Sequence, residues 1–103
     1  MKPEKGKHDN PLPTARQVRR ACGRELYRTA KRLHSHIAPE PMEQAIGFYY
    51  KQVLLHLPYI VQNSGNKKRL ADWFDEHAAT EVAGMWNQEP AVVADAFRQA
   101  LGG

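Results

Sequence analysis

Apolar residues recur at helical spacing from residue 14 onward. Steps of three and four residues separate the first set, which predicts an amphipathic helix from about 14 to 36. Thr14 can cap its start, and Pro39 and Pro41 are expected to end it, because proline lacks an N–H and restricts the residue before it. The apolar set is Ala15, Val18, Cys22, Leu26, Ala30, Leu33 and Ile37.

The middle of the chain predicts a second helix that begins near Pro41 and runs to Leu57. Its apolar residues cover nearly the whole circumference, so we expect a central, buried helix. Pro58 can begin a short helical turn that extends to Val61, and residues 62–66 have the composition of a loop.

The last third predicts further helices. Asn66 can cap a helix to Ala78, which either continues or restarts near Thr80. A tight turn precedes a final helix over 90–101, and Gly102 with Gly103 can close it.

Evidence for strands is thin, because no hairpin-type alternation occurs. We therefore predict an all-α fold, a compact bundle of four to five helices forming one domain over residues 14–103. Residues 1–13 are rich in lysine and proline and are expected to form a flexible basic N-terminal arm.

Composition narrows the functional classes. The chain has 103 residues, 42% of them hydrophobic and 25% charged, as in ordinary globular proteins. No apolar run is long enough to span a bilayer, and no secretory signal is visible. With one cysteine, Cys22, we expect a cytoplasmic protein of prokaryotic or phage scale, without membrane association. The small size argues against an enzyme.

The formal net charge of +4 conceals an uneven distribution. Residues 1–34 hold ten basic and three acidic residues, a net of +7, and residues 35–103 hold five basic and eight acidic, a net of −3. Arginine recurs at every fourth position of the first helix, which places five of them on one slowly spiralling stripe. These are Arg16, Arg20, Arg24, Arg28 and Arg32, flanked by Arg19 and Lys31.

Three interpretations of this stripe stay open. Arginine pairs bidentately with phosphate, so the leading hypothesis is a non-enzymatic protein that binds the backbone of DNA or RNA. Alternatively, the same helix binds an acidic protein partner, as an adaptor, inhibitor or subunit would, or the acidic half of a second copy in a homodimer. The third interpretation is internal pairing with carboxylates of the C-terminal half, namely Asp72, Asp75, Glu76, Glu81 and Asp95.

A second basic cluster lies in the predicted first turn after Asn66 and comprises Lys67, Lys68 and Arg69. Cations there oppose the helix dipole, so the cluster either extends the nucleic-acid site or is explained by a pair between Lys68 and Asp72.

Residues 82–97 have the outline of a helix-turn-helix, with Ala83 and Val93 facing inward and Asn87 at the turn. The second helix has few donors and carries Glu89 and Asp95, so it is poorly suited to reading bases.

The remaining side chains suggest little chemistry. His34 and His36 are separated by one residue, and no third metal ligand is evident near them, so we expect no metal and no cofactor. The carboxylates near His77 have no nucleophile beside them, so we expect no catalytic residue. Cys22 is interpreted as a small core residue. Tyr27 lies among arginines, where it either stacks on a base or packs on a guanidinium.

Overall fold

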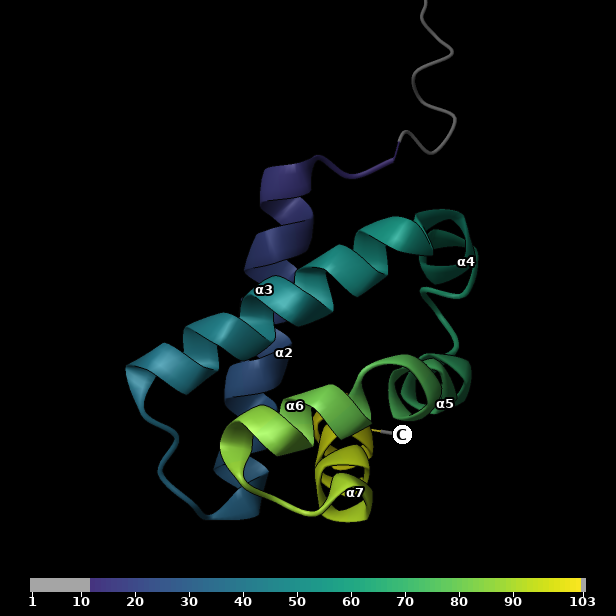
Figure 1. The fold of residues 1–103 in the computed structure, drawn as a ribbon. Helices are drawn as coiled ribbons and strands as arrows, with labels where there is room; N and C mark the ends of the chain where they lie inside the picture. The colour runs from purple at the N-terminus through teal and green to yellow at the C-terminus, as the bar shows by residue number, and fades with distance from the viewer. Residues whose placement is uncertain (1–11, 103) are drawn as a thin grey trace, which may run out of the picture.

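The structure, a computed structural model, describes residues 12–102, and these residues form six helices and no strand (Figure 1). The all-α prediction is confirmed. The expected count of four to five helices is too low by one or two. The helices are α2 (Ala15–Leu33), α3 (Pro39–Leu55), α4 (Leu57–Gln62), α5 (Lys67–His77), α6 (Ala79–Trp86) and α7 (Pro90–Leu101).

Local sequence signals set most helix ends. The Thr14 side chain accepts a hydrogen bond from the backbone N–H of Gln17, whose own side chain accepts from the N–H of Thr14, so a capping box starts α2. Asn66 caps α5 by accepting from the backbone N–H of Arg69 at 3.0 Å. Gly102 ends α7 with a positive φ of 84°, a conformation that glycine adopts without strain.

Two helix ends differ from the prediction. α2 stops at Leu33 because His34 takes the left-handed conformation, and Pro39 then lies in the first turn of α3. Of the two alternatives predicted after Ala78, the structure shows the restart: the chain breaks at Ala78, which separates α5 from α6. The short helix α4 and this break account for the additional helices.

The core forms where α7 packs against α2, α5 and α6, and α3 packs against α2 and α6 (Figure 1). The Phe74 and Phe97 rings stack with centroids 3.8 Å apart. Tyr49 meets both rings edge-on, at 5.4 and 5.7 Å. These aromatic side chains join α3, α5 and α7 in one core.

The expectation that the second helix is buried on all sides is wrong. Met42, Ala45 and Tyr49 of α3 are buried, but Leu54 is 37% exposed and Leu55 is 72% exposed. No neighbouring helix among the described residues covers that side of α3, and an apolar sequence alone cannot say whether such a neighbour exists.

The predicted flexible arm over residues 1–13 lies outside the described residues, except for Leu12 and Pro13, which are exposed and not helical. Within the part that the structure describes, every helix is too short or too polar to cross a membrane.

Candidate nucleic-acid interface

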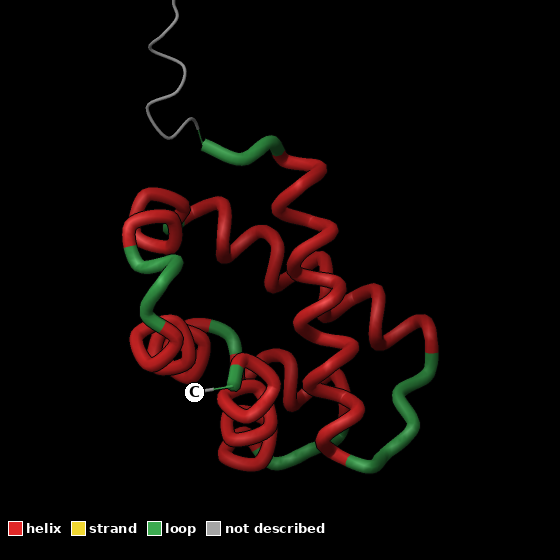
Figure 2. Tube along the Cα trace, turned by 180° about the vertical axis from the view of Figure 1, so that it is seen from behind, coloured by secondary structure: helices red, strands yellow, loops and turns green. Residues whose placement is uncertain are grey.

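Helix α2 carries the basic residues along an open side of the bundle. Its 19 residues extend over roughly 28 Å at 1.5 Å per residue. Seen from behind in Figure 2, α2 crosses in front of α3, and no other helix lies over its outward side. All seven predicted cations of this helix are solvent-exposed, namely Arg16, Arg19, Arg20, Arg24, Arg28, Lys31 and Arg32.

The spacing of the sequence explains why they face outward. The buried residues Val18, Cys22 and Leu26 follow one another at four-residue steps and fix the inward side of α2 against α3 and α7. The arginine stripe is offset by two residues from that series, so it points away from the core. The same burial that holds α2 in place therefore sets the direction of the basic side chains.

Pairing with carboxylates of the described residues does not account for this stripe. Among the described residues, the only ion pair formed by an α2 cation joins Arg19 to Glu43 of α3, at 3.3 Å. Arg19 also lies over the Tyr50 ring, with its guanidinium carbon 5.6 Å from the centroid. The five stripe arginines make no ion pair with a described carboxylate.

Two of the carboxylates considered as partners, Asp72 and Asp95, interact with neighbours outside α2 instead. Asp72 binds Lys68 at 3.3 Å and Arg98 at 2.8 Å, and these hydrogen bonds lower the pKa of its carboxyl group. Asp95 accepts a hydrogen bond from Gln99 at 2.8 Å. These two carboxylates therefore do not neutralise the arginine stripe of α2.

Two hollows flank the stripe. One, of about 360 Å³, lies between α2 and α3 and is lined by Arg16, Arg19, Arg20, Gly23, Tyr27, Glu43 and Ile46. The other, of about 450 Å³, lies between the end of α2 and α7 and is lined by Arg28, Lys31, Arg32, His34, Gln99 and Ala100. Because the stripe spirals, its first arginines border one hollow and its last arginines border the other.

Tyr27 is 57% exposed at the edge of the first hollow, so it is not a core residue. Gly23 lies one helical turn before it on the same side. A Cβ on Gly23 would meet only the Ile46 side chain, at 3.8 Å, so packing does not require glycine there. The absent side chain leaves open space beside the aromatic ring, a detail that the sequence analysis missed. A glycine inside an amphipathic helix, four residues before an aromatic residue, was the available signal.

The second basic cluster has structural explanations of its own. Lys68 pairs with Asp72. The Lys67 ammonium lies 3.4 Å from the position that a Cβ would take on Gly102, at the C-terminal end of α7, where a cation is favourable. Arg69 is exposed. Within residues 12–102 no hydrogen bond or ion pair connects this cluster to α2.

The segment with the helix-turn-helix outline forms α6 and α7. Asn87 takes the left-handed conformation at the turn, with φ 57° and ψ 46°, and Ala83 and Val93 are fully buried. However, α7 is packed against three helices and exposes Val92, Asp95 and Gln99, so it offers no basic side for a nucleic-acid groove.

Comparison with models of known protein families, with curated proteins and with solved structures gives no significant match. A search for metal sites over the described residues finds no group of three histidine, cysteine or carboxylate ligands.

Proposed function

We propose that this protein binds nucleic acid through the outward side of α2, mainly by contacts to phosphates and without catalytic activity. The observation that carries the proposal is the row of five exposed arginines along α2 that pair with no described carboxylate. Like charges at four-residue spacing repel one another by a few tenths of a kcal/mol per pair. A ligand with regularly spaced negative charges would remove that repulsion and release its counterions.

The hollow between α2 and α3 favours single-stranded over duplex nucleic acid. Tyr27 offers an exposed aromatic ring, and Arg16 and Arg20 border the same space. An unpaired base can stack on such a ring while its flanking phosphates contact the arginines. Bases within a duplex are already stacked, so we propose that single-stranded segments bind more tightly than duplex DNA of equal length.

The experiment is a titration of labelled 20-nucleotide RNA, single-stranded DNA and duplex DNA, followed by fluorescence anisotropy from about 50 to 300 mM salt. We expect affinity to fall steeply with salt, as counterion release requires. Absence of binding at about 50 mM salt, or an affinity independent of salt, would overturn the proposal. An acidic protein partner would then be the better explanation of the basic helix.

A pair of double variants separates the α2 side from the total charge. Arg24→Gln with Arg28→Gln removes two exposed cations from the stripe, and Lys51→Gln with Arg98→Gln removes two cations from α3 and α7. The first double variant should weaken binding of single strands by about 25-fold at 0.1 M salt, since a slope of about 0.7 per phosphate contact corresponds to about fivefold per contact there. The second should weaken it much less. Equal losses of affinity in the two double variants would mean that binding depends only on the net charge of the protein.

A further inference from the structure

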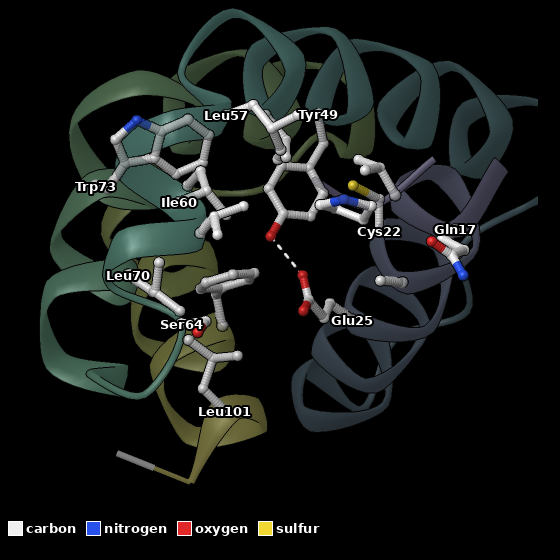
Figure 3. A pocket seen from close by; sticks show the side chains of 16 residues that line it. Gln17, Cys22, Glu25, Tyr49, Leu57, Ile60, Ser64, Leu70, Trp73 and Leu101 are labelled. Atoms are coloured by element: carbon white, nitrogen blue, oxygen red, sulfur yellow. Dashed lines mark hydrogen bonds between the residues drawn. The ribbon is translucent and has the colours of Figure 1, made fainter. Parts of the chain in front are cut away.

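A cavity of about 320 Å³ lies on the inward side of α2 (Figure 3). Its walls come from α2, α3, α5 and α7, and from α4 with the turn that follows it. The surface is mostly apolar, with Leu57 and Ile60 of α4, Trp73 of α5 and Leu101 of α7 facing the space. Helix α4 contributes no buried side chain, so this wall of the cavity is partly open to solvent. The volume falls in the range of small-molecule sites.

One charged group interrupts the apolar surface. Glu25 is the only charged side chain among the described residues that line the cavity, and Figure 3 shows its carboxyl group extending into the space. The Tyr49 hydroxyl, which comes from the opposite wall, donates a hydrogen bond to Oε1 of Glu25. No hydrogen bond or ion pair within residues 12–102 uses Oε2, the other oxygen.

The negative charge of this carboxylate is unfavourable in its surroundings. Burial raises the pKa of Glu25, while the Tyr49 hydrogen bond and the positive charges of Arg24 and Arg28 only oppose that effect. Burial likewise raises the pKa of Cys22, on the same wall, to about 12, so that thiol is unreactive. A glutamine at position 25 would keep an acceptor for the buried Tyr49 hydroxyl without introducing a charge. A charge that lowers stability and that the packing does not require is typical of a binding site.

We propose that the cavity binds a small amphiphilic amine, with its protonated amino group on Glu25 and its hydrocarbon part against the α4, α5 and α7 side chains. The ammonium group donates a charge-assisted hydrogen bond to Oε2 and neutralises the charge of the partly buried carboxylate. Tyr49 holds the carboxylate in place from the other side. This site is separate from the basic side of α2 and does not depend on nucleic-acid binding.

The charge of the ligand headgroup distinguishes binding at Glu25 from non-specific binding in an apolar cavity. The chain has a net charge of +4, and Arg24 and Arg28 flank Glu25 in sequence, so non-specific attraction favours anions. An apolar cavity without a functional carboxylate would bind apolar molecules regardless of their headgroup. Among the residues that the structure describes, Glu25 alone can therefore give this cavity a preference for a cation.

The experiment compares three probes with the same tail, n-octylamine, n-octanol and sodium octanoate, by isothermal titration calorimetry on the full chain at pH 7.5. We expect octylamine to bind about tenfold more tightly than the other two, the factor by which a charged hydrogen bond exceeds a neutral one. Octanoate binding as tightly as octylamine, or no binding by any probe, would overturn the proposal.

Two variants locate the interaction. Glu25→Gln keeps an acceptor for the Tyr49 hydroxyl but removes the charge, so octylamine should bind no better than octanol, whose affinity stays unchanged. Ala21→Leu adds three carbons to a half-exposed position of the cavity wall and should weaken all three probes. An amine preference that persists in Glu25→Gln would contradict the assignment.

A measurement on the unmodified protein covers the case in which Glu25→Gln does not fold. As the pH falls through the pKa of Glu25, the carboxylate is lost and octylamine should bind more weakly, while octanol binding stays constant. Parallel changes for both probes, or none for octylamine down to pH 4, would overturn the proposal.

Discussion

The two sides of α2 perform different tasks with the same four-residue spacing. Inward, Val18, Cys22 and Leu26 are almost fully buried against α3 and α7. Outward, Arg20 and Arg24 repeat at the same interval and remain exposed. The inward side follows the ordinary pattern of an amphipathic helix. The outward side does not, because a helix made only for solubility would mix acidic residues with its arginines.

The comparison also identifies the residues that belong to neither pattern. Glu25 is a carboxylate at the edge of the apolar side, and Tyr27 is a large aromatic ring on the basic side. Gly23 leaves space next to Tyr27. Each of these departs from what packing or solubility alone requires, and each borders a hollow. We therefore expect binding to involve these three positions, where α2 departs from its apolar and basic patterns.

Substitutions on the inward and outward sides of α2 should differ most in their effect on the free energy of unfolding. Leu26→Ala removes a fully buried side chain and should lower the free energy of unfolding by about 3 kcal/mol. Arg28→Ala, two residues later on the exposed side, should change it by less than about 0.5 kcal/mol. Urea denaturation of both variants measures the difference. Similar losses would show that Arg28 has a structural role.

Tyr27 tests whether the basic side does more than attract phosphates. Tyr27→Ala should weaken binding of single-stranded RNA by about 2 kcal/mol if a base stacks on the ring, and should leave duplex binding nearly unchanged. Anisotropy titrations at one salt concentration measure both affinities. Equal weakening of both, or none for the single strand, would remove base stacking from the account.

Substitution of Gly23 should change stability and nucleic-acid affinity in opposite directions. Gly23→Ala should raise the free energy of unfolding by about 1 kcal/mol, because alanine is the better helix former and its Cβ meets only an ordinary contact at 3.8 Å. The same methyl group fills space beside Tyr27, so single-strand affinity should fall. Denaturation and anisotropy on the same preparation measure the two effects. A variant that is stabilised and binds normally would show that the hollow is not occupied.

Glu25 should give the smallest effect, and one that depends on pH. The folded protein binds this proton more tightly than the unfolded chain, whose carboxyl pKa is near 4.5, so the residue lowers stability as the pH rises through that window. Glu25→Gln should therefore raise Tm at pH 7.5 by a few degrees at most, and the gain should vanish below about pH 4.5.

Glu43→Gln serves as the control, since Glu43 is exposed and paired with Arg19. It should show no such gain at pH 7.5. A gain for Glu25→Gln that is independent of pH would mean that the carboxylate charge is not its cause.

The sequence predicts the features that depend on local chemistry. The capping residues Thr14 and Asn66, the left-handed turn at Asn87 and the end of α7 at Gly102 all follow from short-range rules, and the structure confirms them. The exposed arginines follow from helical periodicity, although their ligand stays a prediction.

Other features depend on how helices pack, which periodicity does not reveal. Periodicity leaves open whether the helix after Asn66 continues or restarts, and no proline or glycine marks the break at Ala78 that the structure shows. Leu55 is exposed because no described helix covers that side of α3. The hydrogen bond between Glu25 and Tyr49 joins residues 24 positions apart in two different helices, so the cavity could not be derived from either segment alone.

We propose that the arginines of α2 contact phosphates. The salt dependence of RNA affinity in a triple arginine variant tests this most directly. Arg20, Arg24 and Arg28 are changed together to glutamine, and the affinity for single-stranded RNA is measured across salt concentrations. We expect the slope of log K against log salt to be shallower by about 2, at about 0.7 per lost phosphate contact, with folding nearly unchanged. An unchanged slope, or a large loss of stability in this variant, would contradict it.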